Sequence, residues 1–351
     1  MNVVILFLLY FALAGGVIFV TSKASNHIDE IDSKTNLGSA VLGGVLLAAV
    51  TSLPELVTST VSSLGIGMEA TPSLALGNIL GSNLFNMMIL GIVDIFFIKR
   101  FYLANVDKGN RKANLFVVAM YVILFVPVII FNLFLGTSTI ALITNWSFSI
   151  LSILLIGVYV VNILNTKTNE SNEEEETKET QPIKKNIIMF SLWSALIVII
   201  SVCITLVTDN LSAELNLGAS FAGAIFLGVA TSLPEFTAVI TLVKLKNYAS
   251  AIGNIIGSSL FNLVILSFVD IITPNQNIFS ILFKRDEITG NFMTNETNLL
   301  ILGTFSVLIL LYAFTRKRPD GSSISVGKKI LYILPSIILV GNYIVYLLLS
   351  V

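Results

Sequence analysis

Long apolar stretches dominate the chain and are separated by short polar connections. Each stretch has roughly the 20 residues that an α-helix needs to cross about 30 Å of hydrocarbon. The pattern predicts an all-α membrane protein with ten transmembrane helices. They are expected near residues 1–21, 36–64, 72–98, 114–134, 145–164, 187–208, 216–243, 248–272, 299–315 and 329–350. Because no basic residue precedes the first stretch, we expect a membrane helix there rather than a cleaved signal peptide.

The composition agrees with the lipid bilayer as the main partner. Hydrophobic residues make up 55% of the 351 positions and charged residues only 12%, far from the balance of a soluble domain. The net charge is −1 and the basic residues form no single patch, so nucleic acid is not an expected partner. No obligate protein partner is evident. One cysteine, Cys203, and one histidine, His27, leave no disulfide framework and no multi-histidine metal site.

The basic residues predict an orientation. Of the 20 Lys and Arg residues, all but Lys284 and Arg285 fall in the odd-numbered connections between the ten stretches. Connections rich in Lys and Arg stay in the cytoplasm. We therefore expect a multi-pass protein of the plasma membrane with both termini outside.

The chain contains an internal repeat. Residues 36–55 and 216–235 are identical at ten of twenty positions, and residues 76–95 and 252–271 at thirteen of twenty. The pattern predicts two five-helix repeats, 1–164 and 187–351, joined by an acidic cytoplasmic linker at 165–186. Since each repeat has an odd number of helices, the second is inverted in the membrane. Inverted repeats bring equivalent helices together near the bilayer midplane, as in secondary transporters.

Each repeat carries the sequence TSLPE, which places Glu55 and Glu235 inside the bilayer. A carboxylate there costs about 2.5–3.5 kcal/mol on insertion scales and marks a functional site by default. The proline before each glutamate, Pro54 or Pro234, removes a backbone hydrogen bond and frees carbonyl groups one turn back. We expect the second and seventh helices to break or tilt at these prolines, since both stretches are long for one straight crossing.

The second block adds hydroxyl and amide oxygens. Ser82 and Asn86 are four residues apart, as are Ser258 and Asn262, so each pair lies on one helix face. An oxygen shell without sulfur or imidazole suits a hard cation such as Ca²⁺. The expected ligands are Glu55, Glu235, Thr51, Thr231, Ser52, Ser232, Ser82, Ser258, Asn86 and Asn262. Competition between Ca²⁺ and Na⁺ for one such site would give exchange.

Other polar residues in these blocks are interpreted differently. The GxxxG pairs are expected to pack helices closely. For Asn78 and Asn254, an interhelical hydrogen bond and cation binding are about equally plausible, so we leave them out of the core site. Asp94 and Asp270 lie near helix ends and are expected to be interfacial.

A TSLPE motif followed by GNxxGSNxxN, in each of two inverted repeats, resembles the cation/calcium exchanger superfamily, with the sodium/calcium exchanger branch closest. The resemblance covers nearly the whole chain. It implies that Glu55 and Glu235 hold Ca²⁺ with help from the backbone carbonyls of Thr51 and Thr231. It further implies Na⁺ sites at Ser52, Ser82, Ser232 and Ser258. Ca²⁺ and Na⁺ would be transported ions, with no cofactor.

The sequence departs from that family at two positions. Asn262 stands where sodium/calcium exchangers commonly carry an aspartate, and Ser259 replaces the motif asparagine. Asn262 leaves the ion stoichiometry open. A Ca²⁺/H⁺ antiporter or an antiporter of another divalent cation is the alternative, although Thr51 and Ser52 replace the glutamate-rich variant typical of the calcium/proton branch.

Two other classes are less well supported. An intramembrane hydrolase could use paired carboxylates, but the sequence has no HExxH motif and no nucleophile elbow. A channel could use the same residues, but its flux would be fast and uncoupled. We therefore expect a transporter and not an enzyme.

Overall fold

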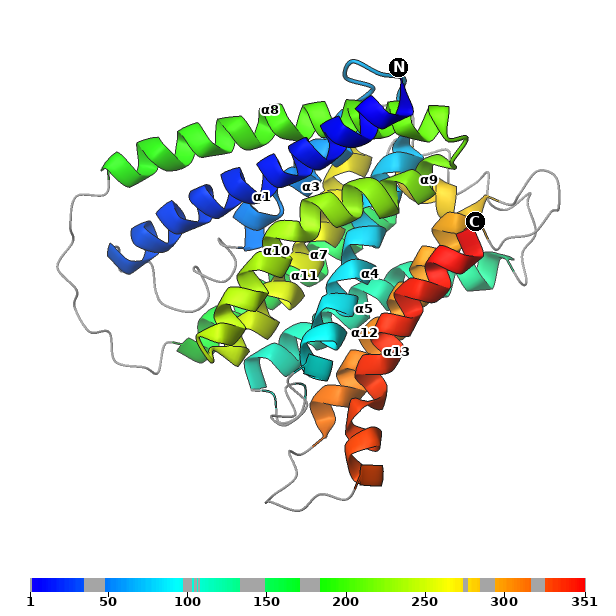
Figure 1. Cartoon of the computed structure of the whole chain (residues 1–351). Coiled ribbons are helices and arrows are strands. Elements are labelled where there is room, and N and C mark those ends of the chain that lie inside the picture. Colours follow the sequence, from blue (N-terminus) through cyan, green and yellow to red (C-terminus); the bar gives the residue numbers. More distant parts are fainter. Residues whose placement is uncertain are drawn as a thin grey trace.

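The computed structural model describes residues 2–34, 48–96, 103, 106, 108–132, 149–170, 184–273, 277–284, 294–316 and 326–350. Within them every regular element is a helix (Figure 1). The helices are α1 (Val3–Lys34), α3 (Leu53–Leu64), α4 (Pro72–Phe96), α5 (Lys108–Ile130), α7 (Ile150–Glu170), α8 (Lys184–Glu214), α9 (Ala219–Ala222), η3 (Gly223–Leu227), α10 (Gly228–Lys244), α11 (Tyr248–Ile272), η4 (Ile278–Phe283), α12 (Asn295–Thr315) and α13 (Val326–Ser350).

The predicted all-α class is confirmed for the described residues. Eight helical segments are long and apolar enough to cross a membrane, and α7 adds a shorter apolar stretch, Ile150–Asn165. The second expected segment is described only from residue 48 onward, where helix is present. The count of ten crossings therefore stays a prediction. In the expected linker at 165–186, α7 extends to Glu170 and α8 begins at Lys184, while residues 171–183 lie outside the described part.

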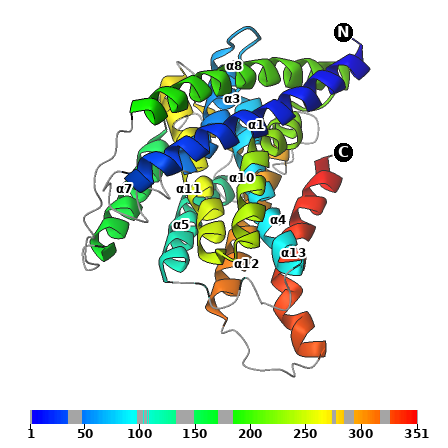
Figure 2. The same cartoon turned by 60° about the vertical axis from the view of Figure 1, so that its left-hand side comes forward.

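Figures 1 and 2 show how the helices are arranged. The two long helices α1 and α8 lie side by side and cross obliquely over the steeper helices of the bundle. Helix α1 packs against α10, and α8 packs against α3. Helix α4 contacts α10 and α13, while α11 contacts α3 and α7. Each half is therefore packed against the other through matching pairs of helices.

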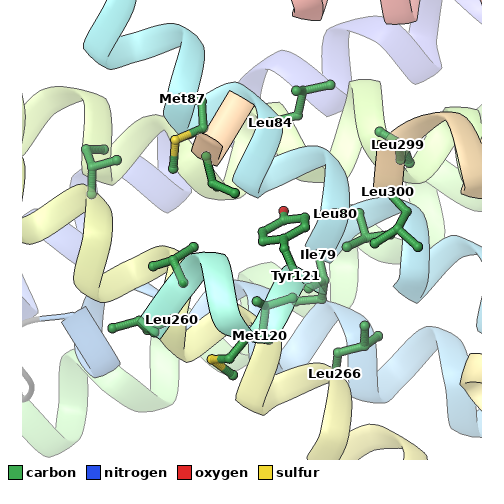
Figure 3. Close-up of a cluster of buried hydrophobic side chains, with 14 of the residues drawn as sticks. Ile79, Leu80, Leu84, Met87, Met120, Tyr121, Leu260, Leu266, Leu299 and Leu300 are labelled. Atoms are coloured by element: carbon green, nitrogen blue, oxygen red, sulfur yellow. The ribbon is translucent and has the colours of Figure 1, made fainter. Parts of the chain in front are cut away.

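The two most buried spans, α4 and α11, pass through the centre of the bundle. Figure 3 shows their apolar side chains meeting those of α5 and α12. Leu84 from α4, Tyr121 from α5 and Leu299 from α12 are fully buried in this cluster, and Leu260 from α11 is 2% exposed. Since both halves contribute, the core that holds the central helices belongs to the whole chain.

Glycine allows α4 to approach the second half backbone to backbone. A Cβ atom on Gly77 would lie 2.1 Å from the carbonyl oxygen of Ser220, and one on Gly81 would lie 2.4 Å from Cα of Ala224. Real Cβ atoms do not come this close, so only glycine fits at these two positions. The expected packing role of this GxxxG pair is confirmed, and it brings α4 directly onto α9 and η3.

Candidate cation-binding site

The two TSLPE motifs meet where α3, α4, α10 and α11 come together. Helices α3 and α4 contact one another, as do α10 and α11, and α4 also contacts α10 while α11 contacts α3. Glu55 on α3 and Glu235 on α10 are both 0% exposed. The four helices therefore enclose both carboxylates within the protein.

The first motif lies at a break in the helix. Residues 48–51 are helical, Ser52 is not (φ −91°, ψ 11°), and α3 starts at Leu53 with Pro54 in its first turn. Proline is tolerated there because the first N–H groups of a helix have no intrahelical acceptor. Glu55 also lies in this first turn, where the positive end of the helix dipole stabilises a carboxylate. The expected break near Pro54 is confirmed.

The second motif is built differently. Pro234 lies inside α10, with helix on both sides, so the helix does not break at this proline, and a tilt there stays a prediction. The irregular turn lies upstream, where Gly223–Leu227 form a π-helix. A π turn redistributes the backbone hydrogen bonds within a continuous helix. The Gly228 carbonyl, next to this turn, accepts a hydrogen bond from Ser82 of α4 at 3.2 Å.

The serines of the two motifs cross between the halves. Ser52 Oγ donates to Glu235 Oε1 at 3.4 Å, and Ser232 Oγ donates to Glu55 Oε1 at 3.5 Å. Each glutamate thus receives a hydrogen bond from the serine of the other half. This reciprocal pairing makes the two motifs one polar site.

Ser258 on α11 strengthens one side of the site. Its hydroxyl donates to Glu235 Oε1 at 2.9 Å and lies 2.9 Å from Ser52 Oγ. The equivalent Ser82 on α4 bonds instead to the Gly228 carbonyl and lies 3.4 Å from Thr231 Oγ1. The surroundings of the two carboxylates are therefore similar but not identical.

The second oxygen of each carboxylate is buried. Among the described residues, no hydrogen-bond donor reaches Glu55 Oε2 or Glu235 Oε2, and both atoms are buried. A buried acceptor without a partner costs about 1–3 kcal/mol, and more when it is charged. Two such oxygens between hydroxyl groups fit a bound cation, which would satisfy both.

The threonines and asparagines differ in which of their polar atoms could bind a cation. The Thr51 and Thr231 hydroxyls lie 3.2 and 2.8 Å from backbone carbonyls one turn back, to which they can donate. Thr231 can also donate to Asn78 Oδ1 at 3.4 Å. Asn86 on α4 is buried, and neither of its amide atoms has a partner among the described residues. Asn262 on α11 donates through Nδ2 to Asn83 Oδ1 at 3.0 Å, and its own Oδ1 is unpaired. All are oxygen donors, which suits a hard cation.

Asn78 and Asn254, whose roles the sequence left open, differ in their hydrogen bonds. Asn78 Nδ2 bonds to Thr58 Oγ1 at 2.8 Å and to Ser59 Oγ at 2.9 Å, so it links α4 to α3. At the positions equivalent to Thr58 and Ser59, the second repeat carries alanine and valine. Neither amide atom of Asn254 has a partner among the described residues. Interhelical bonding therefore accounts for Asn78 and not for Asn254.

Asp94 and Asp270 lie near the ends of α4 and α11 and are buried within the protein, at 3% and 0% exposed. Their place at the membrane interface stays a prediction. Asp270 accepts hydrogen bonds from the Ser149 amide, the Ser152 hydroxyl and the Ile278 amide at 2.6–2.8 Å. Asp270 thus links α11 to the start of α7 and to η4.

Asp94 makes the matching contacts in the first half. It accepts from the Leu103 amide at 3.0 Å and from the hydroxyl of Ser336 on α13. In both halves the aspartate joins its own following connection to the last helix of the other half. The partners of both aspartates lie too far away in the sequence to have been predicted from it.

The site is made of oxygen alone. Among the described residues, no group of three or more His, Cys, Asp or Glu side chains comes together as a metal site. The candidate site instead combines two carboxylates with hydroxyl and amide oxygens. Such a shell suits a hard cation.

A multi-pass helical bundle that buries two carboxylates is typical of an integral membrane transporter. The chain belongs to the sodium/calcium exchanger protein family, whose model matches residues 3–166 and 185–351. This confirms the resemblance to the cation/calcium exchanger superfamily.

Solved structures share the fold. The structure described as native YfkE is 16% identical, with a TM-score of 0.60, and the comparison covers 96% of this chain and 92% of that one. The H⁺/Ca²⁺ exchanger CAX is 16% identical, with a TM-score of 0.61 and coverage of 100% and 87%. The sodium-calcium exchanger NCX_Mj, soaked with 10 mM Na⁺ and 10 mM Sr²⁺, is 19% identical, with a TM-score of 0.57 and coverage of 96% and 98%. A sequence comparison with curated proteins finds no match.

Proposed function

We propose that this protein is a secondary active antiporter that exchanges Na⁺ for Ca²⁺ by alternating access. Membership of the sodium/calcium exchanger family supports a cation antiporter. The observation that carries the proposal is the reciprocal pairing of Ser52 with Glu235 and of Ser232 with Glu55. One site shared by two halves can open to either side of the membrane when the halves move against one another.

The choice of ions follows from the charge and the ligands of the site. Two carboxylates supply a charge of −2, which one Ca²⁺ neutralises, and Na⁺ can occupy the same oxygens. Ca²⁺ takes 6–8 oxygen ligands, and the ten residues proposed as ligands offer enough. Thr51 and Ser52 in the first motif favour Na⁺ over H⁺ as the coupled ion.

The proposal includes the arrangement in the membrane. In this arrangement the protein has ten transmembrane helices in two inverted repeats. Both termini lie outside the plasma membrane, and the 165–186 linker lies in the cytoplasm. The matching contacts of α1 with α10 and of α8 with α3 support such a repeat. The distribution of Lys and Arg supports the orientation.

Transport by purified protein in proteoliposomes tests the function. Vesicles loaded with Na⁺ and diluted into Na⁺-free medium with ⁴⁵Ca²⁺ should accumulate Ca²⁺, and an outward H⁺ gradient alone should not drive uptake. Uptake driven by H⁺ and not by Na⁺ would replace the Na⁺ proposal with the Ca²⁺/H⁺ alternative. Rapid uptake without any countertransported ion would indicate a channel.

Substitution of either glutamate tests the site within the same assay. Glu55→Gln and Glu235→Gln keep the shape of the side chain and remove its charge, so each should abolish Ca²⁺ uptake while the protein still folds. Glu69→Gln is the matched control, because Glu69 is exposed in the connection that follows α3. Normal uptake by either site variant would contradict the assignment.

A further inference from the structure

Asn83 lies between the two halves and bonds to both an amide and a backbone carbonyl of α11. Its Nδ2 donates to the carbonyl oxygen of Ser259 at 3.2 Å. Its Oδ1 accepts from Asn262 Nδ2 at 3.0 Å. Asn83 is 1% exposed and Asn262 is 0% exposed, so water does not compete for these bonds.

The two bonds determine which way the Asn262 amide is turned. The oxygen and nitrogen of an asparagine side chain have nearly the same shape, and only hydrogen bonding distinguishes the two orientations. A backbone carbonyl can only accept, so the Asn83 atom facing Ser259 must be nitrogen. The Asn83 atom facing Asn262 is then oxygen, which requires Asn262 to present its nitrogen to Asn83.

The Asn262 oxygen consequently points away from Asn83. It is buried and has no partner among the described residues. Asn262 lies one helical turn after Ser258, on the same face of α11, and Ser258 bonds directly to Glu235 Oε1. If the amide were reversed, an NH₂ group would take the place of this unpaired oxygen, and an NH₂ group cannot bind a cation.

The positions equivalent to Asn83 and Asn262 in the opposite repeats, Ser259 and Asn86, are arranged differently in the part of the chain that the structure describes. Ser259 stands at the position equivalent to Asn83, and its hydroxyl has no partner among the described residues. Asn86, which is equivalent to Asn262, is unpaired at both amide atoms. A serine side chain is too short to reach across as Asn83 does. Among the described residues, nothing therefore selects one orientation of the Asn86 amide.

We propose that Asn83 is a positioning residue that holds the Asn262 carboxamide with its oxygen towards the transported cation. This inference rests on the proposed function and deepens it. The two amides of the site then differ, since Asn262 is a pre-oriented oxygen ligand and Asn86 must be turned by the ion itself. Pre-orientation raises affinity because the ordering is not required at the moment of binding.

The test is a double-mutant cycle on Ca²⁺ binding to the purified full-length protein in detergent, measured by isothermal titration calorimetry. The variants are Asn83→Ser, Asn262→Ala and the double variant. Asn83→Ser should raise the Ca²⁺ dissociation constant about tenfold, the factor expected for one hydrogen bond that orients a ligand. The double variant should bind Ca²⁺ no more weakly than Asn262→Ala alone. Ser259→Ala is the matched control and should leave the constant unchanged.

Two results would overturn the proposal. One is an unchanged dissociation constant in Asn83→Ser, and the other is a further loss of about tenfold when Asn83→Ser is added to Asn262→Ala. A merely structural role would lower the unfolding temperature without this dependence on Asn262. Should Asn83→Ser not fold, Ser259→Asn serves instead, since it should orient Asn86 and lower the constant, and an unchanged constant would count against the proposal.

The cycle also separates this inference from the proposed function. Wild-type protein that binds no Ca²⁺ would contradict the proposed function. The same cycle with Na⁺ as titrant would then decide whether Asn83 positions Asn262 for a monovalent ion, and additive effects there would overturn the inference.

Discussion

Ser52 Oγ lies 3.4 Å from Glu235 Oε1, so a serine in one TSLPE motif bonds to the glutamate of the other. The two residues are 183 positions apart in the chain. The matching contact, Ser232 to Glu55, has nearly the same length, 3.5 Å. A movement of one half against the other would therefore disturb both carboxylates together.

The crossed serines should contribute comparably to cation affinity. Ser52→Ala and Ser232→Ala each remove a hydroxyl next to a glutamate, and each should raise the Ca²⁺ concentration for half-maximal uptake by about tenfold, as expected for a hydrogen bond to a charged group. The measurement is ⁴⁵Ca²⁺ uptake into proteoliposomes over a range of Ca²⁺ concentrations. Ser191→Ala is the control, because that exposed serine bonds only to its own helix. Unchanged uptake in both site variants would show that the serines are not ligands.

Substitution of Gly77 or Gly81 should prevent normal folding. Alanine at either position would place Cβ within 2.1–2.4 Å of the backbone of α9 or η3, and overpacking of this kind costs about 1–3 kcal/mol or more. We expect Gly77→Ala and Gly81→Ala to lower the unfolding temperature or abolish monodisperse expression. Gly15→Ala and Gly157→Ala are controls, since a Cβ there meets nothing within 4 Å. A Gly77→Ala protein as stable as the controls would contradict the close packing of α4.

The buried aspartates should stabilise the fold without setting ion affinity. Asp270→Ala leaves two backbone amides and the Ser152 hydroxyl without their acceptor. Unsatisfied buried groups cost about 1–3 kcal/mol each, so the unfolding temperature should fall clearly. Ser152→Ala removes one of these bonds and should have a smaller effect. The Ca²⁺ concentration for half-maximal uptake should be unchanged in Ser152→Ala. A large shift in this concentration would mean that the bond between Ser152 and Asp270 is coupled to the cation site.

Asn78 and Asn254 should respond differently to the same substitution. Asn78→Ala removes the bonds from its amide to Thr58 and Ser59 of α3 and the longer contacts with the Glu55 carbonyl and the Thr231 hydroxyl, at a cost of about 1–3 kcal/mol in stability. Asn254 has no protein partner among the described residues, so Asn254→Ala should leave the unfolding temperature of the ion-free protein nearly unchanged. Equal destabilisation by the two substitutions would contradict the distinction, and thermal unfolding in detergent measures both.

The internal repeat made much of this architecture predictable. Two matching blocks with a glutamate in an apolar stretch indicated which helices carry the site, because an intramembrane carboxylate needs partners. The helical class followed from the length of the apolar stretches. The break at Ser52 could be expected from Pro54, since a proline there fits the first turn of a new helix.

Other features depend on contacts that the sequence pattern does not contain. Pro234 suggested a second break, but the π turn at Gly223–Leu227 takes up the irregularity upstream. Asp94 and Asp270 were placed near helix ends, but their hydrogen-bond partners in the last helix of the opposite half could not be predicted. The bond between Asn83 and Asn262 could not be predicted either, since it depends on the packing of α4 against α11.

The most direct test of the central claim is the position of Ca²⁺ in the protein itself. Crystals grown with Ca²⁺ should show an anomalous difference peak between the two motifs, about 2.3–2.6 Å from a carboxylate oxygen of both Glu55 and Glu235. The peak should disappear in Glu55→Gln crystals grown under the same conditions. A Ca²⁺ peak that contacts only one of the two glutamates, or that persists unchanged in Glu55→Gln, would contradict a single site shared by the two halves.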